Sequence, residues 1–141
     1  MVIVDIGQNF KVDRRNMKAE ALLMHPNQYT IACRATAPTG AAIVQVYDFA
    51  AKKKLKQCQL SEKIEFWNWI NDTTLGIITS ASVYHLDLNA AGETVTATKI
   101  FDRDARLTGA HIMGYNVDDS GKWCFVHGIA SNEAKQITGV L

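Results

Sequence analysis

One recurring pattern of short strands limits the possible folds of this chain more than any other feature of its sequence. The segments LLMHP, FWNWI and HIMGY begin at residues 22, 66 and 111, so they lie 44 and 45 residues apart. Each is followed by a turn and an apolar strand (TIACRA, TLGIIT, WCFVHGIA), then by a more alternating strand (VQVYDF, SVYHLDL and, less regularly, QITGVL). Four short strands in roughly 40–50 residues are typical of a propeller blade. An immunoglobulin-like sandwich also has many short strands, but it does not predict this recurrence.

Most of the remaining sequence also has the length and composition of strands. Turn segments such as HPNQ, APTG, NDTT, NAAGE and DDSGK separate them. Helical periodicity is weak, and the best helical candidate is the short segment 17–24. We predict an all-β fold, a propeller fragment of about three four-stranded blades. Its parts are the end of one blade at 1–18, blades at 19–62 and 63–106, and a partial blade at 107–141.

The number of blades is too small for a closed ring. Propellers close with about four to eight blades, and the 141 residues supply only about three. The chain opens on VIVDI, already a strand, and stops at GVL within another. We therefore expect a piece of a longer protein, or a chain that needs neighbours to complete its ring, with bare apolar faces at its ends.

The segment EFWNWIND concentrates two of the three tryptophans of the chain. In a strand, Trp67 and Trp69 point to one face while Phe66, Asn68 and Ile70 point to the other. A blade packs both of its faces against neighbouring blades, so both faces of its strands can be apolar. We interpret the two tryptophans as packing residues rather than as a binding site.

Composition and motifs give little indication of catalysis. No run of 18 apolar residues and no charged-then-apolar leader occurs, so we expect neither a membrane span nor a secretory signal. The cysteines (Cys33, Cys58 and Cys124) fit no zinc or redox spacing and are expected to be reduced, buried thiols. The histidines have no metal-ligand spacing, and no serine elbow or glycine-rich phosphate loop is present. We predict no catalytic residues, no metal and no cofactor.

The charge distribution instead indicates a binding surface early in the chain. Residues 11–56 carry nine lysines and arginines against three acids. In AIVQVYDF, one strand face is expected to carry Ile43, Gln45, Tyr47 and Phe49. Shortly afterwards Lys52, Lys54 and Lys56 are expected to share a face of the next strand.

An apolar strip bordered by ammonium groups suits an extended peptide with bulky apolar residues and an acid. Exposed lysines contribute little each, so such a site would bind weakly and rely on multivalency. The same residues are also consistent with blade core and a solvated lysine face.

Several of these segments resemble a known family. FWNWI followed by SVYHLDL, KIFDR, GYNVDDSGKW and the GI of HGIAS is similar to the N-terminal β-propeller of the clathrin heavy chain. VIVDI, VDRRNM, ALLMHP and VQVYDF extend the resemblance in the family's order over nearly the whole chain. It implies part of a seven-bladed propeller that binds clathrin-box peptides of endocytic adaptors, in which apolar residues are followed by an acid.

The resemblance also implies positions for the peptide sites. The clathrin-box groove, between the first two blades, falls on Ile31, Gln45, Tyr47, Lys52 and Lys54, with Ile43 where the family usually has threonine. Asp13 stands where an apolar groove residue is expected, beside Val12, and the loop 36–41 is longer than usual. A second site would involve His111, Met113 and Ile129, with His111 in place of the usual glutamine.

The function implied by the resemblance is adaptor docking in clathrin-coated vesicle formation, endocytosis and intracellular protein transport. The implied location is cytoplasmic, at coated pits and vesicles, with membrane contact only through adaptors and no nucleic-acid partner. The rest of the heavy chain and the light chain would be partners through the leg. The alternatives are a WD40-like scaffold for another complex, although no WD or GH signature is present, and an enzyme built on a propeller.

Overall fold

The computed structural model describes residues 1–131 and 136–140, and its architecture is all-β, which confirms the predicted fold class. The strands, joined near the end by one short 3₁₀ helix, are β1 (Val2–Asp5), β2 (Lys11–Arg14), β3 (Ala21–Met24), β4 (Thr30–Thr36), β5 (Ala42–Asp48), β6 (Lys53–Leu60), β7 (Ile64–Asn71), β8 (Thr74–Thr79), β9 (Ser82–Asp87), β10 (Thr98–Asp102), η1 (Ala105–Leu107), β11 (His111–Val117), β12 (Cys124–Ser131) and β13 (Ile137–Val140).

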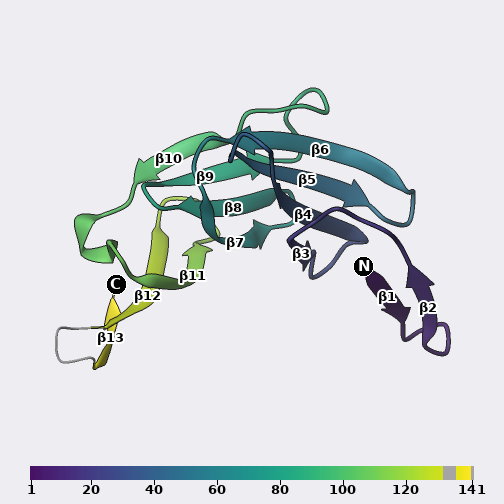
Figure 1. Ribbon diagram of the computed structural model, residues 1–141, viewed down its shortest axis with the longest axis horizontal. Coiled ribbons are helices and arrows are strands. Elements are labelled where there is room, and N and C mark those ends of the chain that lie inside the picture. The colour runs from purple at the N-terminus through teal and green to yellow at the C-terminus, as the bar shows by residue number, and fades with distance from the viewer. Residues whose placement is uncertain (132–135, 141) are drawn as a thin grey trace.

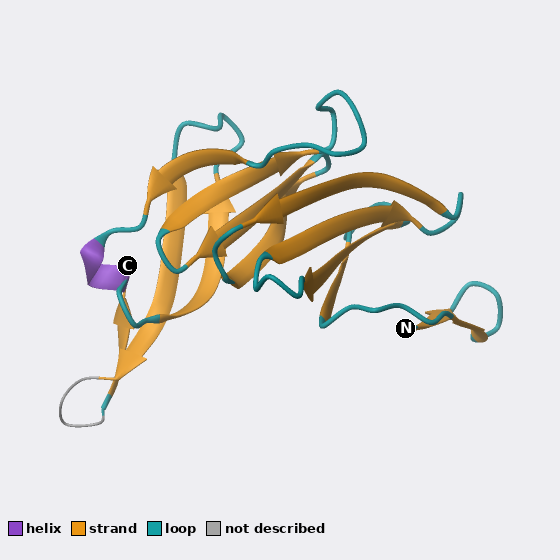
Figure 2. Cartoon of the chain, turned by 45° about the horizontal axis from the view of Figure 1, so that its top comes forward, coloured by secondary structure: helices purple, strands orange, loops and turns teal. Residues whose placement is uncertain are grey.

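These strands form four antiparallel sheets that follow one another in chain order. The ribbon β1–β2 is followed by the four-stranded sheets β3–β6 and β7–β10, and then by β11–β13. Figure 1 shows the ribbon at one end of the molecule and β11–β13 at the other, and Figure 2 shows the sheets between them fanned face to face. Four-stranded meanders stacked in this way are the arrangement of consecutive propeller blades.

The recurring segments open successive sheets, as the repeat predicted. LLMHP lies in β3 and the turn after it, FWNWI lies in β7 and HIMGY lies in β11, each the first strand of its sheet. The segment 17–24, the best of the weak helical candidates, forms no helix: Ala21–Met24 is a strand that pairs with β4 and alternates between half-buried and exposed positions. The predicted partial blade 107–141 includes positions 132–135 and 141, which lie outside the described residues.

Two apolar layers hold the sheets together. Val44, Val46, Leu75 and Ile77 belong to the layer between β3–β6 and β7–β10, and all four are fully buried. A second layer, centred on Tyr115, joins β7–β10 to β11–β13. Each of the two four-stranded sheets therefore needs apolar side chains on the face that meets its neighbour.

The tryptophan segment divides between these two layers as predicted. Trp67 and Trp69 pack against the first layer, whereas Phe66 and Ile70 pack against the second. Asn68 shares the face of Phe66, and its Nδ2 donates to the backbone oxygen of Tyr115 at 2.7 Å. The prediction that the tryptophans are packing residues is confirmed.

The segment TVTATKIF (94–101) has the composition of a single strand but does not form one along its whole length. Only its second half is in β10, while residues 93–95 cross to the neighbouring sheet and bridge the free edge of β6. The amide of Gln57 donates to Glu93 O at 2.7 Å, and the amide of Val95 donates to Gln57 O at 2.9 Å. We call residues 93–95 the rim strap, because they bind the outer edge of one sheet to the other.

Candidate functional site

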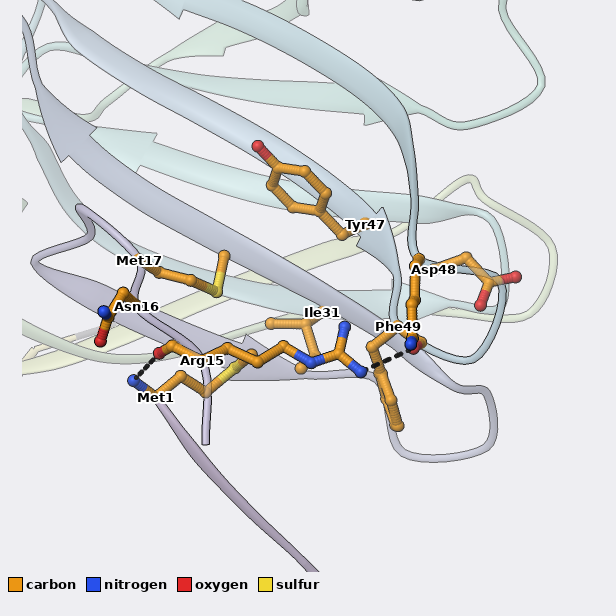
Figure 3. A pocket seen from close by; sticks show the side chains of 9 residues that line it. Met1, Arg15, Asn16, Met17, Ile31, Tyr47, Asp48 and Phe49 are labelled. Atoms are coloured by element: carbon orange, nitrogen blue, oxygen red, sulfur yellow. Dashed lines mark hydrogen bonds between the residues drawn. The ribbon is translucent and has the colours of Figure 1, made fainter. Parts of the chain in front are cut away.

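A groove lies between the ribbon β1–β2 and the exposed face of sheet β3–β6. It consists of an inner cavity of about 230 Å³, lined by Ile31, Tyr47 and Lys52 among others, and an outer cavity of about 530 Å³. Phe49 lines both cavities. Figure 3 shows Tyr47, Ile31 and Phe49 around the inner cavity, with Arg15 extended along it from the ribbon side. We call this the first groove.

Strand alternation places the predicted residues on the groove side of the sheet. Val44 and Val46 of β5 are fully buried against the next sheet, so Ile43, Gln45 and Tyr47 point the other way and are half-buried. The register of β4 and β5 sets Tyr47 directly opposite Ile31, and directly opposed residues in an antiparallel pair share a face. Ile31 therefore joins them.

A β-bulge decides which lysines reach this face. The register between β5 and β6 shifts at Val46 and Tyr47, so that Tyr47 pairs with Lys54 and Val46 pairs with Lys56. Lys54 therefore lies on the groove side, whereas Lys56 lies on the opposite side and donates to the backbone oxygens of Ala90 and Gly92 in the β9–β10 loop. The expectation that Lys56 shares a face with Lys54 is wrong, because the bulge inserts one residue and reverses the alternation beyond it.

Lys54 is part of a polar chain that runs across the sheet. The Tyr47 hydroxyl donates to Gln45 Oε1 at 3.1 Å, and Gln45 Nε2 donates to Gln57 Oε1 at 2.8 Å. Lys54 Nζ donates to the same Gln57 oxygen at 3.1 Å and forms an ion pair with Glu93 at 2.8 Å. The hydrogen bond that Lys54 donates to the Glu93 carboxylate raises the pKa of Lys54 above its ordinary value. The chain fixes the orientation of the Gln45 amide beside the groove.

Lys52 reaches the groove from a turn rather than from a strand. It lies just before β6 with a φ of 56°, a left-handed conformation that is uncommon outside glycine. The Asp48 carboxylate stabilises the same turn by accepting from the amide of Ala51 at 2.9 Å. Within the part of the chain that the structure describes, Lys52 forms no ion pair, and its side chain lines the inner cavity.

The ribbon supplies the other wall of the groove. Nε and Nη2 of Arg15 both donate to Asp13 Oδ2, at 2.9 and 2.8 Å, and Nη2 also donates to the backbone oxygen of Phe49 at 3.4 Å. The hydrogen bond from Arg15 lowers the pKa of Asp13. Asp13 and Val12 both line the outer cavity, so a charged residue does face the groove where an apolar one was expected. The pair with Arg15 explains how that carboxylate is accommodated.

The long loop 36–41 lies away from the first groove. It joins β4 to β5 at the end of the hairpin opposite to Tyr47 and Asp48. Gly40 lines a separate cavity together with Arg34 and Lys63. The loop therefore does not line either cavity of the first groove.

Three residues of this site escaped prediction from the sequence. They are Arg15, Gln57 and Glu93. The register of the β5–β6 hairpin would have paired Gln57 with Gln45. No local signal indicates Glu93, because it arrives from the next sheet on the rim strap.

The second predicted site lies on sheet β11–β13. His111 pairs directly with Ile129, and Met113 is the extra residue of a bulge in β11. All three side chains are exposed, and they lie at the same end of the first two strands of this sheet. His111 lines a cavity with Arg34 and Lys63.

The structure has no feature that indicates metal chemistry in its described residues. No group of three or more histidine, cysteine, aspartate or glutamate side chains is placed to hold a metal ion in residues 1–131 and 136–140. The same residues contain no helix of the length and apolar character needed to cross a bilayer.

Asp118, predicted to lie in a turn, accepts from the amides of Ser120 and Trp123 in the β11–β12 hairpin.

Comparison with known proteins gives similarity to clathrin heavy chains. Clathrin heavy chain 1 of Arabidopsis thaliana is 37% identical over 131 residues, which is 92% of this chain and 8% of the relative. The probable clathrin heavy chain of Schizosaccharomyces pombe is 30% identical over 94% of this chain and 7% of the relative, and clathrin heavy chain 2 of Homo sapiens is 26% identical over 97% and 8%. The chain thus spans less than a tenth of the length of these relatives. No family model matches the chain.

Proposed function

Since this chain is homologous to a segment of the clathrin heavy chains, we propose that it is a non-enzymatic module that docks adaptor peptides in the first groove. The peptides are of the clathrin-box kind, with apolar residues followed by an acid. In this proposal the segments 1–18, 19–62, 63–106 and 107–141 belong to successive blades of a seven-bladed propeller. The module acts in clathrin-coated vesicle formation, endocytosis and protein transport, at the cytoplasmic face of coated pits. The rest of the heavy chain and the light chain are its partners through the leg.

One observation carries the proposal. A groove with an apolar floor, made by Ile31, Tyr47 and Phe49, opens beside two lysines of the same sheet and its turn. Extended peptides bind in such grooves when pockets accept alternate side chains and polar groups fix the register. The apolar residues of a peptide would contact the floor, and the ammonium groups would attract its acid.

The strength of such binding should be low for a single peptide. The groove is open and short, and the lysines remain in contact with water, where an ion pair contributes little. Repeated motifs in one adaptor, or several adaptors on one membrane patch, raise the effective concentration without any new contact. Weak and repeated contacts suit a coat that must assemble and come apart.

A peptide titration tests the proposal. A fluorescent clathrin-box peptide and a version with its acid replaced by alanine are titrated against the 141-residue chain, with anisotropy as the readout. We expect the acidic peptide to bind several times more tightly, and we expect Tyr47→Ala to weaken it about tenfold, because an aromatic wall of the pocket is lost. Trp123→Ala is the matched control, since it removes a 77% exposed aromatic ring outside the first groove.

Two results would contradict docking in this groove. One is equal binding of the acidic and alanine peptides, which would favour the scaffold alternative. The other is an equal loss on Tyr47→Ala and Trp123→Ala, which would place the peptide elsewhere. Circular dichroism of each variant establishes that the sheets have formed.

We further propose His111, Met113 and Ile129 as a weaker, second peptide site. The three side chains are exposed together at one end of sheet β11–β13, and two of them are apolar. Met113→Ser should reduce binding of an apolar peptide that still binds the Tyr47→Ala variant. Unchanged binding on Met113→Ser would exclude this site.

A further inference from the structure

The two lysines beside the first groove differ in their partners. Lys54 Nζ is held between the Glu93 carboxylate at 2.8 Å and the Gln57 amide oxygen at 3.1 Å. Lys52 lines the inner cavity and forms no ion pair among the described residues. A carboxylate within its electrostatic influence is that of Asp13, which already pairs with Arg15. One ammonium group is therefore occupied and the other is available.

Glu93 does not approach Lys54 on a freely moving loop. It is the first residue of the rim strap, and its backbone oxygen accepts from the amide of Gln57, the residue whose side chain also contacts Lys54. One residue earlier, the backbone oxygen of Gly92 accepts from Lys56 Nζ at 2.6 Å. Bonds on both sides of β6 thus fix the strap, and they hold the carboxylate at the outer end of the polar chain.

We propose that Glu93 is a specificity residue that masks Lys54, so that Lys52 is the group that receives the acid of a docked peptide. The inference rests on the proposed docking function of the first groove. Glu93 occupies the position that a ligand carboxylate would need beside Lys54. An acid directed towards Lys54 must therefore displace Glu93 and meets its like charge, whereas an acid directed towards Lys52 meets neither obstacle.

The masking determines which peptides the groove accepts. When the acid of a peptide lies at the turn end of the sheet, beside Tyr47 and Lys52, it forms an ion pair with Lys52 without competition from Glu93. A peptide with a second acid directed along β6 towards Lys54 gains little from it, because that acid is repelled by Glu93. The side chains of Lys54 and Glu93 are 31% and 54% exposed, so water weakens the competition to a modest factor.

Four variants separate the roles of the three charges. Binding of the acidic and alanine peptides is measured by anisotropy to the native chain, Lys52→Gln, Lys54→Gln, Glu93→Gln and the double variant Lys54→Gln/Glu93→Gln. We expect Lys52→Gln to reduce the affinity for the acidic peptide to that for the alanine peptide, and Lys54→Gln to change it less than about twofold. Glu93→Gln should tighten binding about two- to fivefold.

The double variant identifies the path of the effect. If Glu93 acts by masking Lys54, removing Glu93 brings no gain once Lys54 is already neutral. The gain in the single variant should also shrink when the salt concentration is raised, because exposed charges are screened. Asp119→Asn is the matched control, because it removes one exposed carboxylate from the β11–β12 hairpin, outside both cavities of the first groove.

The possible failures are distinguishable. Weaker binding on Glu93→Gln would mean that Glu93 positions Lys54 for the ligand, and it would overturn the masking. A larger loss from Lys54→Gln than from Lys52→Gln would overturn the assignment of Lys52. A native chain that fails to distinguish the acidic from the alanine peptide would instead overturn the proposed function itself.

Discussion

Replacement of Gly76 by alanine tests how tightly the sheets are packed. Gly76 lies in β8, where sheet β7–β10 meets the ring of Tyr115 from β11. A Cβ atom at this position would lie 2.7 Å and 2.9 Å from two ring carbons of Tyr115 and 3.1 Å from Cγ2 of Ile70. Ordinary contacts of this kind begin at 3.4 Å, so the closest one is short by 0.7 Å.

The tyrosine ring has no room to move away. Tyr115 is fully buried, its hydroxyl lies 2.8 Å from Nε2 of His85, and its backbone oxygen accepts from Asn68. Relief must come from separation of the two sheets, and overpacking of this kind costs about 1–3 kcal/mol. Alanine also reduces the freedom of the unfolded chain, which offsets about 0.4–1 kcal/mol. We expect a net loss of about 1–2 kcal/mol in the free energy of unfolding.

Thermal and urea unfolding followed by circular dichroism measures this loss. Gly139→Ala is the matched control, since Gly139 lies in strand β13 and a Cβ atom added there would meet no heavy atom within 4 Å, so stability should not fall. The pair Gly76→Ala and Tyr115→Leu should lose less than the sum of the single variants, because the smaller side chain makes space. Equal stability of Gly76→Ala and Gly139→Ala would refute the close packing described for this interface.

Three other predictions concern buried groups. Arg103→Met should lower the free energy of unfolding by about 2–4 kcal/mol, measured by urea titration. The Arg103 side chain is only 4% exposed, it pairs with a glutamate of β7, and it donates to two backbone oxygens that would each lose a partner. Arg106→Met, at an exposed arginine, is the control, and an equal loss of stability in both variants would contradict the argument from burial. Burial lowers the pKa of His85, so stability is complete above the ordinary value of about 6.5 and is lost as pH falls from there towards the lowered value. The His85→Gln variant should therefore show a flatter dependence of Tm on pH, and parallel curves would count against this. Cys124 is exposed, so the expectation that all three cysteines are buried is wrong for this residue. At about pH 8, near the ordinary pKa of a thiol, a thiol reagent should label Cys124 in the native chain well before Cys33 and Cys58, whose pKa values burial raises to about 11. Mass spectrometry identifies the labelled site, and early labelling of a buried thiol would disprove the arrangement.

Alternation along single strands could be interpreted from the sequence alone. AIVQVYDF predicts that Ile43, Gln45 and Tyr47 share a face, and the structure places them together on the groove side of β5. The packing role of the tryptophan segment could be predicted in the same way, because a strand that packs on both faces must be apolar on both. These predictions need only the twofold period of a strand.

Contacts that depend on register or on a second sheet could not be predicted in this way. Lys56 lies on the unexpected face because a bulge between β5 and β6 adds one residue, and no feature of the local sequence places that bulge. Glu93 meets Lys54 only because residues 93–95, in the connection between β9 and β10, bridge the edge of β6 in the neighbouring sheet. The chemistry of the site therefore depends on tertiary structure, although its outline follows from secondary structure.

The backbone bonds of the rim strap have a dynamic consequence. The amide of Gln57 lies at the free edge of β6 and the amide of Val95 lies in the segment that leads into β10, and each donates to a backbone oxygen of the other segment. The outer edge of β6 therefore cannot open without releasing the strap. Hydrogen exchange at these two amides should be slow to the same degree and should speed up together when the strap is released. A ligand seated against β5 and β6 should then slow hydrogen exchange at Val95, in the connection between β9 and β10 and outside both cavities of the first groove.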